Sequence, residues 1–465
     1  MEITGNVYQA HRKLSACSAK FLEFIRDNPE ALKQSNFHDV LHPNFETEPA
    51  QPWPIFINRE TKREMEEVGV QILNLIRSIP RRVFSNDIES ISLYYGIPGD
   101  LVKIQLDGMN DEHLANLLGR GDFIFSPSGM KCIEYNISST IGGWEVAILA
   151  PLYLKTPVIS KFLQEYQVKT SNKNMFAILM EHLLIAALKK FSPGSRCNEI
   201  NIVIALPNYS KSADQIMIEK YVNRQYKHIL QLKYSHWQGE AIVCGFLHLN
   251  IKDECIFYES KRIHALVEFC QGDVPTPIME IFKKGNILLY NGPIRGLLGN
   301  KLNLVILSQS EDSNLFTLQE RKIIKKYIPW TRRLTEGKAS FDAKAVDLQD
   351  FVLSHREKLV IKSAAGQGGD DVHIGQYTPQ PQWEILVKNA ARERNWVVQE
   401  YTEPYPYLFQ SGTNGCIEHH AVWGLLFFGT RYAGGYLRIL PKDTGKGVIN
   451  VHRGAEKAVI FEVDE

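Results

Sequence analysis

The chain has 465 residues, and its 53 Lys and Arg residues almost balance its 52 Asp and Glu residues, leaving a formal net charge of +1. This balance gives no overall attraction to nucleic acid or to an acidic membrane surface, so neither is expected as a partner. The seven cysteines are scattered without any Cys-x-x-Cys pair, which argues against a zinc centre and a disulfide framework and favours a reducing compartment.

The sequence predicts a cytoplasmic protein that does not enter a membrane. No basic stretch leading into an apolar run follows Met1, as a secretory signal would require. The longest apolar segment, from Met175 to Leu188, contains Glu181 and His182 and is too short to span a bilayer. We expect this segment to form a buried helix.

Residues 1–85 are expected to be mostly helical, with a proline-rich break from His42 to Pro54. Apolar residues recur with the 3.6-residue period of a helix in the stretches Phe21–Ile25 and Met65–Ile76. The whole chain is long enough for two or three domains with cores of their own.

Residues 86–150 contain a predicted hairpin, within the sequence GRGDFIFSPSGMKCIEYN. Two short strands would flank the turn Ser126-Pro127-Ser128-Gly129. Because side chains alternate along a strand, Glu134 and Asn136 would share a face, together with Cys132, and the hairpin would bring Asp122 alongside them.

Two carboxylates and an amide oxygen on one face are ligands that Mg²⁺ accepts when it also binds substrate phosphates. Arg120, two residues before Asp122, would donate a forked pair of hydrogen bonds to phosphate or carboxylate. The alternative is an ordinary strand whose polar face is solvated.

Residues 151–290 alternate between helical and strand patterns, which predicts a small parallel α/β unit. A helix is expected at 175–190, a strand at Ile200–Leu206 and a helix at Ser212–Tyr226, followed by strands near 241–250 and 255–259. The loop that begins at Pro207 would lie at the carboxyl end of a strand, where α/β sheets tend to bind ligands. It is either an acceptor pocket or an ordinary connection.

A glycine-rich loop between two strands is predicted from Lys358 to Gly375. Its glycines would let backbone N–H groups approach phosphate oxygens, and Lys362 would end the first strand just before them. The spacing is neither that of a Walker loop nor that of a Rossmann fingerprint. Farther on, an apolar strand ends in Gln399 and Glu400, where it could meet an adenine edge.

These segments together resemble the ATP-grasp ligases, in particular the branch typified by the C-terminal domain of glutathionylspermidine synthase. In that branch the acidic segment precedes the lysine and the glycine-rich loop, and this chain has the same order. Three further segments fit: Leu288–Lys301 with its final Asn-Lys, Ile328–Leu334, and Val422–Asn450 with Arg438. The resemblance is sparse in identity but spans roughly residues 95–455.

The resemblance implies an α/β (α+β) fold, namely an ATP-grasp fold with a preceding small parallel α/β domain and an N-terminal helical region. The helical region would be residues 1–85, the metal-binding segment 86–150, the small α/β domain 151–290, and the nucleotide-binding lid and core 291–465.

The resemblance also implies the roles of individual residues with ATP and one or two Mg²⁺. The metal ligands would be Asp122, Glu134 and Asn136. The nucleotide would be bound by Lys301, Lys362, Gly366, Gly368, Gly369, Gln399 and Glu400. The residues that neutralise charge on the transferred phosphoryl group would be Arg120 and Arg438.

The chain departs from the family pattern at two places. After Lys362 the loop reads Ser-Ala-Ala-Gly-Gln-Gly-Gly, where the family more often has a proline and an arginine or glutamate, which bears on the loop's catalytic competence. After Asn136 it reads Ile-Ser-Ser-Thr-Ile-Gly-Gly-Trp instead of Ala-Asp-Thr-Pro. Because the second segment borders the acceptor site, it indicates a substrate other than the synthase's own.

The implied activity is that of an ATP-dependent carbon–nitrogen ligase, which couples a small-molecule acid to an amine or amino acid and releases ADP and phosphate. Natural-product ligases of the mycosporine-forming type are one candidate group, with an enol in place of the carboxylate. Two alternatives stay open: a nucleotide-binding partner module without catalysis, and a small-molecule kinase. A homodimer is one open alternative for the assembly.

Overall fold

The computed structural model describes residues 3–29, 50–108, 110–192, 198–206, 209–269, 274–366, 369, 371–411, 415–444 and 447–465, without the side chains of residues 214 and 452. Several sequence expectations lie outside the described residues: those for Gly368, Pro207, Cys197, Cys270 and most of the proline-rich break.

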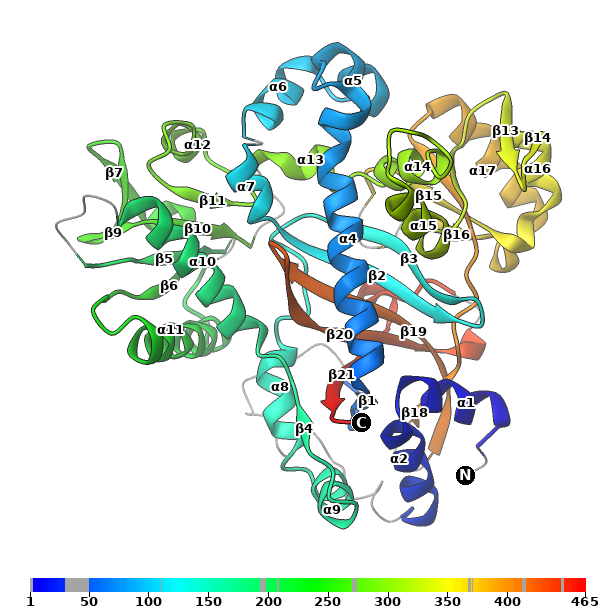
Figure 1. Ribbon diagram of the computed structural model, residues 1–465, viewed down its shortest axis with the longest axis horizontal. Helices are drawn as coiled ribbons and strands as arrows, with labels where there is room; N and C mark the ends of the chain where they lie inside the picture. The colour runs from blue at the N-terminus through cyan, green and yellow to red at the C-terminus, as the bar shows by residue number, and fades with distance from the viewer. Residues whose placement is uncertain are drawn as a thin grey trace.

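An eight-stranded sheet, here called the main sheet, forms the centre of the molecule (Figure 1). Its strands come from both ends of the chain, and they pair antiparallel except for the parallel pair of β1 and β21. The order is β1 (Ile55–Ile57), β21 (Glu456–Val463), β20 (Arg431–Pro441), β19 (Gly415–Phe428), β2 (Leu118–Ser126) and β3 (Gly129–Asn136), with β18 (Tyr407–Ser411) paired to β19 and β4 (Thr170–Ser171) to β21.

The long helix α4 (Arg59–Phe84) runs across the main sheet (Figure 1). It begins where the Asn58 side chain accepts a hydrogen bond from the Thr61 backbone N–H, at 2.8 Å, and it ends at Ser85 in the left-handed conformation. Its apolar residues recur with helical spacing and are buried against the sheet. The helical expectation for Met65–Ile76 is confirmed.

Shorter helices complete the N-terminal half around the main sheet. The expected helix over Phe21–Ile25 is confirmed within α2. The shorter helices are α1 (Gly5–Leu14), α2 (Ala16–Asp27), α5 (Ile88–Tyr95), α6 (Gly99–Asp107), α7 (Asp111–Ala115), α8 (Val146–Tyr153) and α9 (Pro157–Glu165).

A four-stranded sheet in the order β11-β10-β5-β6 confirms the predicted parallel α/β unit. The first helix of this unit is as predicted, but the second extends to Lys233, seven residues beyond the expected Tyr226. The elements are α10 (Met175–Phe191), β5 (Ile202–Ala205), α11 (Ala213–Lys233), β6 (Ala241–Cys244), β10 (Ala265–Glu268), α12 (Thr276–Lys283) and β11 (Leu288–Tyr290).

The single strand expected near 241–250 is wrong. A 3-10 turn at Phe246–His248 interrupts the apolar run, and the residues after it enter a separate antiparallel sheet of three strands. That sheet consists of β7 (Leu249–Lys252), β8 (Cys255–Tyr258) and β9 (Lys261–Ile263).

Residues 295–400 form the fourth part of the fold, here called the lysine unit because Lys301 and Lys362 belong to it. It contains an antiparallel sheet in the order β12-β17-β15-β16. The predicted strand, glycine-rich loop and strand correspond to β15 and β16. The elements are α13 (Arg295–Leu298), α14 (Leu302–Gln309), α15 (Leu318–Tyr327), β12 (Thr331–Arg333), β13 (Lys338–Phe341), β14 (Lys344–Asp347), α16 (Leu348–Ser354), β15 (Leu359–Ser363), β16 (Val372–Ile374), α17 (Gln380–Glu393) and β17 (Trp396–Glu400).

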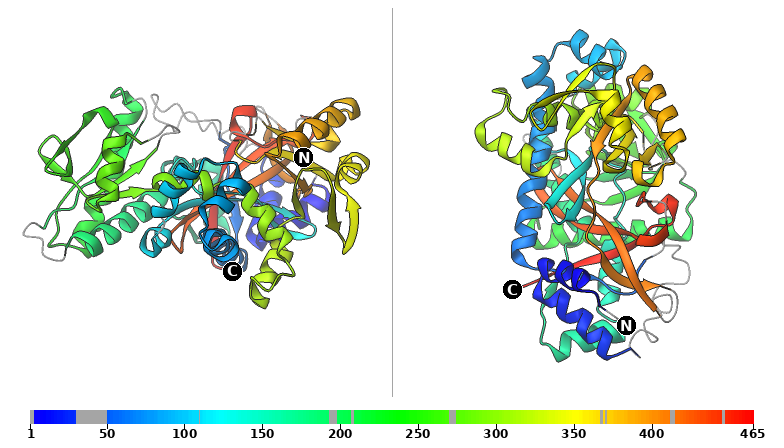
Figure 2. Two further views of the ribbon diagram at one scale, coloured as in Figure 1. Left: turned by 90° about the horizontal axis from the view of Figure 1, so that it is seen from above. Right: turned by 90° about the vertical axis from the view of Figure 1, so that its right-hand side faces the viewer.

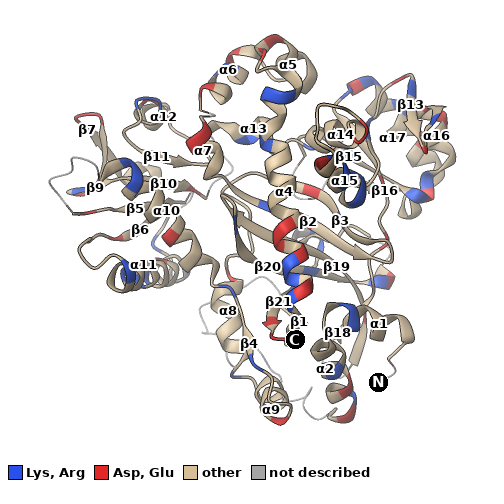
Figure 3. Cartoon of the chain, in the orientation of Figure 1, with Lys and Arg blue, Asp and Glu red and all other residues tan. Residues whose placement is uncertain are grey.

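The α/β unit and the lysine unit lie on opposite sides of the main sheet (Figures 1 and 2). Acidic and basic residues both occur in all parts of the fold (Figure 3). Within the described ranges no single helix is long and apolar enough to cross a membrane, although α8 and α9, bent by 63° at their break, meet that test of length and composition as a pair.

Replacing Gly69 by Ala should destabilise the protein, because α4 packs there directly on β19. A Cβ atom at Gly69 would lie 1.9 Å from Cζ of the Phe427 ring. Overpacking costs about 1–3 kcal/mol, and so short an approach belongs at the upper end of this range. Because Ala gains about 1 kcal/mol over Gly in a helix, we expect a net loss of about 2 kcal/mol in urea unfolding.

The matched control is Gly5→Ala in α1, where no atom lies within 4 Å of the added Cβ. That variant should unfold at the wild-type urea concentration or slightly above it. Equal stability of Gly69→Ala and wild type would contradict the close packing of α4 on the main sheet.

Candidate functional site

A cavity of about 810 Å³ lies between the main sheet and the lysine unit, and one end of it reaches the α/β unit. Its lining brings together side chains from β2, β3, β15, β17 and β20, which are far apart in the sequence. The predicted site residues that line it are Arg120, Asp122, Glu134, Asn136, Lys301, Lys362, Gly366, Gly369, Gln399, Glu400 and Arg438. Gly368 lies outside the described residues.

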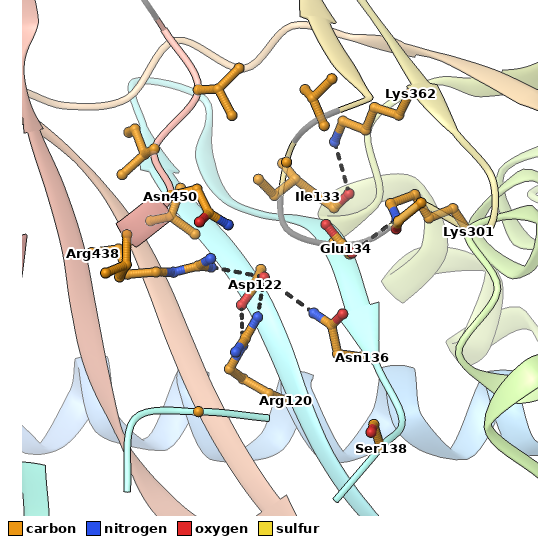
Figure 4. A pocket seen from close by; sticks show the side chains of 18 of the residues that line it. Arg120, Asp122, Ile133, Glu134, Asn136, Ser138, Lys301, Lys362, Arg438 and Asn450 are labelled. Carbon is orange, nitrogen blue, oxygen red and sulfur yellow. Dashed lines mark hydrogen bonds and ion pairs between the residues drawn. The ribbon is translucent and has the colours of Figure 1, made fainter. Parts of the chain in front are cut away.

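The hairpin of β2 and β3 has the predicted turn and places its polar residues as expected. Ser126 pairs with Gly129 across the turn, and Asp122 lies directly opposite Glu134. Arg120 lies opposite Asn136 in the same register. All four polar side chains of these two pairs therefore face the cavity (Figure 4).

The placement of Cys132 beside Glu134 is wrong. The register shifts between Asp122 and Phe123, so that Ile133 is an extra residue on β3 and breaks the alternation of side chains. Cys132 is consequently buried in the apolar core, while Ile133 and Glu134 both line the cavity. Burial raises the pKa of the Cys132 thiol well above its ordinary value.

Asp122 lies at the centre of a cluster of cations (Figure 4). Arg120 donates to it twice, from Nε to Oδ1 at 2.7 Å and from Nη2 to Oδ2 at 3.0 Å. Arg438 Nη2 lies 2.8 Å from Oδ2, and Asn136 Nδ2 donates to the same oxygen at 3.2 Å. Burial would raise the pKa of Asp122, but the two guanidinium groups outweigh it and hold the pKa below its usual value.

Arg438 has a donor left over. Its side chain is 9 % exposed, and its Nε has no hydrogen-bond partner among the described residues. An unpaired buried N–H group is costly unless a ligand supplies an acceptor. The guanidinium of Arg438 is therefore suited to hold an oxyanion in the cavity.

Two lysines connect the hairpin to the lysine unit. Lys301 Nζ donates to the Gly366 carbonyl at 2.5 Å and lies 3.2 Å from Glu134 Oε1. Lys362 Nζ donates to Gln399 Oε1 at 2.8 Å and to the Ile133 carbonyl at 3.2 Å. Both ammonium groups thus lie over the same edge of β3 (Figure 4).

Burial lowers the pKa of Lys362 to about 8, and the positive charge of Lys301 adds to this effect. The negative charge of Glu134 opposes it. An ammonium group in this state gains much from an anionic ligand, because a phosphate would replace the lost hydration.

The Gln399 side chain turns into the protein. It is 2 % exposed, and besides accepting from Lys362 it donates to Thr331 Oγ1 at 3.0 Å. Gln399 therefore positions Lys362, an interaction that the sequence did not indicate. Glu400, the next residue, is exposed at the edge of the cavity.

The stem of the glycine-rich loop is tied to the residue that carries the first lysine, since Lys301 N–H donates to the Ala364 carbonyl at 3.0 Å. Gly369 has a φ of +79°, which favours glycine. A Cβ atom there would lie 3.1 Å from Val448 on the opposite side of the cavity. The loop therefore approaches the C-terminal segment closely.

Sequence reasoning missed several lining residues. Glu145 and Lys457 form a buried ion pair in the cavity wall, yet 312 residues separate them and no motif links them. At the end nearest the α/β unit the wall contains Leu206, Ser212 and Gln215. These residues follow β5 and begin α11, so the carboxyl end of this strand borders the cavity. The acceptor pocket expected there stays a prediction.

The donor set fits a phosphate-bearing ligand with a hard cation. The lining contains more guanidinium and ammonium groups than carboxylates. Glu134 Oε2 and the amide oxygen of Asn136 have no partner among the described residues, so they are suited to hold Mg²⁺. Within the same residues, no group of three or more Asp, Glu, His or Cys could hold a metal ion.

No family model and no curated protein matches the sequence significantly. Among solved structures, the chain is similar to a glutathione synthetase-like effector from Globodera pallida in its apo form, over 100 % of both chains, with a TM-score of 0.60 and 12 % identity. The chain also has a distant likeness to D-alanyl-alanine synthetase A from Vibrio cholerae, with a TM-score of 0.29 and 11 % identity over 56 % of this chain and 74 % of that one.

The full-length similarity and the arrangement of sheets establish the fold class. The chain has a mixed α/β architecture, shares the fold of this glutathione synthetase-like effector, and has a cavity between two of its sheets. At this level of identity the likeness concerns the fold alone, and the chemistry has to be argued from the cavity.

Affinity for a phosphate-bearing ligand such as an ATP analogue should fall as the pH rises through about 8, the pKa of Lys362. Below that pH the ammonium group is charged and attracts phosphate; above it the group is mostly neutral. From pH 7 to pH 9 the protonated share falls from about nine-tenths to about one-tenth, so affinity measured by calorimetry should drop up to ~10-fold.

The control is Lys362→Arg, whose guanidinium stays charged over this range. It should bind the analogue with little dependence on pH between 7 and 9, even if its absolute affinity differs. A pH dependence as steep as that of wild type would show that another group is responsible.

Proposed function

We propose that this protein is an ATP-dependent ligase that joins a small-molecule acid to an amine or amino acid through a carbon–nitrogen bond. The proposal rests on one observation: a single cavity collects two lysines, the guanidinium of Arg438 and the oxygens of Glu134 and Asn136. Phosphoryl transfer asks a protein mainly for positioning and neutralisation of charge, and these groups supply both.

The reaction would proceed in two steps. An oxygen of the acid, a carboxylate or an enol, forms a bond to the γ-phosphorus of ATP, and the bond from that phosphorus to the β,γ-bridging oxygen breaks, which releases ADP. The amine nitrogen then attacks the activated carbon and phosphate leaves, while the nitrogen gives up a proton to solvent.

The residues would divide this work by position. Lys301 and Lys362 would bind the phosphates, and Arg438 would hold the phosphoryl group through its unpaired Nε. Glu134 and Asn136 would hold Mg²⁺, which neutralises phosphate charge and orients the leaving group. Closure of the glycine-rich loop over the cavity would keep water away from the phosphorylated acid.

The end of the cavity next to the α/β unit is suited to the acid and the amine. Trp144, Leu206 and Ile218 give it apolar walls, and Ser212 and Gln215 give it polar groups. A pocket of mixed character can orient a small organic molecule while the charged end binds the nucleotide.

A nucleotide-binding module without catalysis is the second candidate, and one observation favours it. Within the described residues, no group of three or more Asp, Glu, His or Cys could hold a metal ion. A metal ion with few protein ligands would be held mainly by the phosphates of the bound nucleotide.

The decisive measurement is the nucleotide product formed from MgATP with pools of acids and amines. ADP and phosphate whose formation requires both an acid and an amine would support the ligase. ADP formed with the acid alone, without an amine-dependent product, would identify a kinase. AMP with pyrophosphate would refute the proposed chemistry, and ATP binding without any turnover would favour the binding module.

Replacing Glu134 by Gln should lower kcat/KM by ~100-fold or more and leave the fold unchanged, because it removes a charge that would face the metal. The matched control is Glu254→Gln, an exposed residue that pairs with Lys284 at 2.6 Å far from the cavity. Wild-type activity of Glu134→Gln would refute the role of Glu134, whereas equal losses in both variants would indicate a general effect on folding.

A further inference from the structure

Asp122 is the residue whose surroundings agree least with a metal ligand. Both of its oxygens already accept hydrogen bonds, one from Arg120 and the other from Arg120, Arg438 and Asn136. The residue is 3 % exposed. Three donors leave Oδ2 no place for a metal ion, and a metal ion at the remaining lone pair of Oδ1 would lie directly beside the buried guanidinium of Arg120, which is electrostatically unfavourable.

Arg120 is fixed on its far side as well. Its Nη1 donates to the Ile141 carbonyl and to Tyr436 Oη, the latter at 3.1 Å. The Tyr436 ring in turn fills the space beside Gly143, where a Cβ atom would lie 2.0 Å from the ring. Nε, Nη1 and Nη2 of Arg120 are thus all engaged within the protein, which leaves little for a ligand.

Arg438 differs from Arg120 in this respect. Its Nη2 forms an ion pair with Asp122, and its buried Nε has no hydrogen-bond partner among the described residues. The groups therefore form a chain that runs from Tyr436 through Arg120 and Asp122 to Arg438. Figure 4 shows the part of this chain from Arg120 to Arg438. Every link is satisfied except the last one, which faces the cavity.

We propose that Asp122 is a positioning residue that, together with Arg120, orients the guanidinium of Arg438 toward the transferred phosphoryl group, and that the metal is held by Glu134 and Asn136 without Asp122. This inference rests on the proposed phosphoryl-transfer function. It assigns different roles to two carboxylates that lie opposite each other on β2 and β3. Asp122 would position an arginine, and Glu134 would bind the metal.

The two carboxylates differ in ways that support this division. The side chain of Glu134 is 24 % exposed and has one cationic partner, Lys301, whereas the Asp122 side chain is 4 % exposed and has two. A phosphate that attracts Lys301 would free Glu134 for a metal ion. Nothing comparable frees Asp122, because Arg120 is held by three groups at once.

The test is the affinity of the protein for Mn²⁺ in the presence of a non-hydrolysable ATP analogue, measured by electron paramagnetic resonance. Three proteins are compared with wild type: Asp122→Asn, Glu134→Gln and the control Asp27→Asn, which removes an exposed carboxylate paired with Arg26 at 2.8 Å. We expect Glu134→Gln to bind Mn²⁺ ~10-fold or more weakly. Asp122→Asn keeps an oxygen that can accept the hydrogen bond from Asn136, so it should bind Mn²⁺ within about two-fold of the control.

An equal loss of Mn²⁺ affinity in Asp122→Asn and Glu134→Gln would overturn the inference, since Asp122 would then be a ligand. Unchanged affinity in both would overturn it too, because Glu134 would not hold the metal. Neither measurement requires turnover, so a failure of the ligase proposal, seen in the nucleotide product, is recognised separately.

A second arm tests whether Asp122 acts through Arg438. We expect Asp122→Asn to lower kcat at unchanged KM for Mg²⁺, and to have little further effect on kcat in an Arg438→Met background. If Asp122 had a merely structural role, Asp122→Asn would lower the melting temperature in both the wild-type and the Arg438→Met background. It would then also lower kcat by the same factor in both backgrounds. Additive effects of Asp122→Asn and Arg438→Met on kcat would contradict the positioning role.

Discussion

In the main sheet, β19 pairs with β2 on one side and with β20 on the other, so a strand from the first third of the chain lies directly beside strands from its C-terminal end. The β19–β2 register places Gly424 opposite Asp122, and the β19–β20 register places Val422 opposite Arg438. Asp122 and Arg438 are 316 residues apart in the sequence and still form a 2.8 Å ion pair. Asp122 and Arg438 meet in the cavity wall only because β2, β19 and β20 belong to the same sheet.

A glycine on β19, Gly424, leaves room for the charged side chains that line the cavity on the main sheet. Gly424 lies between Asp122 and Tyr436, and a Cβ atom there would come within 3.1 Å of Arg120 Cδ and 2.9 Å of the Tyr436 ring. Buried ion pairs such as these add little net stability, because desolvation offsets their attraction. Their value lies in fixed geometry: an arginine held by a buried carboxylate reaches the cavity in one orientation.

Local sequence signals were sufficient for the elements but not for their mutual contacts. The Ser-Pro-Ser-Gly turn and the alternation around Glu134 predicted the hairpin, and apolar periodicity predicted α4. A long apolar segment predicted α10, and alternating helix and strand patterns predicted the parallel unit. The bulge at Ile133 leaves no comparable signal, because it arises from the fit of β3 against β2. The same holds for Gln399, whose hydrogen bonds to Lys362 and Thr331 join three strands that only the tertiary fold brings together.

The ion pairs of the cavity also bear on how a nucleotide and a metal would enter. In the described structure Glu134 is neutralised by Lys301, and Lys301 is in turn held by the Gly366 carbonyl of the glycine-rich loop. Polyphosphate competes with both partners for the ammonium group, since a charged oxyanion is a stronger acceptor than a carbonyl. Once Lys301 turns to phosphate, Glu134 carries an uncompensated negative charge next to that phosphate, and a divalent cation would neutralise both groups.

Under the proposed function, nucleotide and metal would therefore bind cooperatively. The cooperativity would come from the exchange of one lysine between a carboxylate and a phosphate, without any rearrangement of the main sheet.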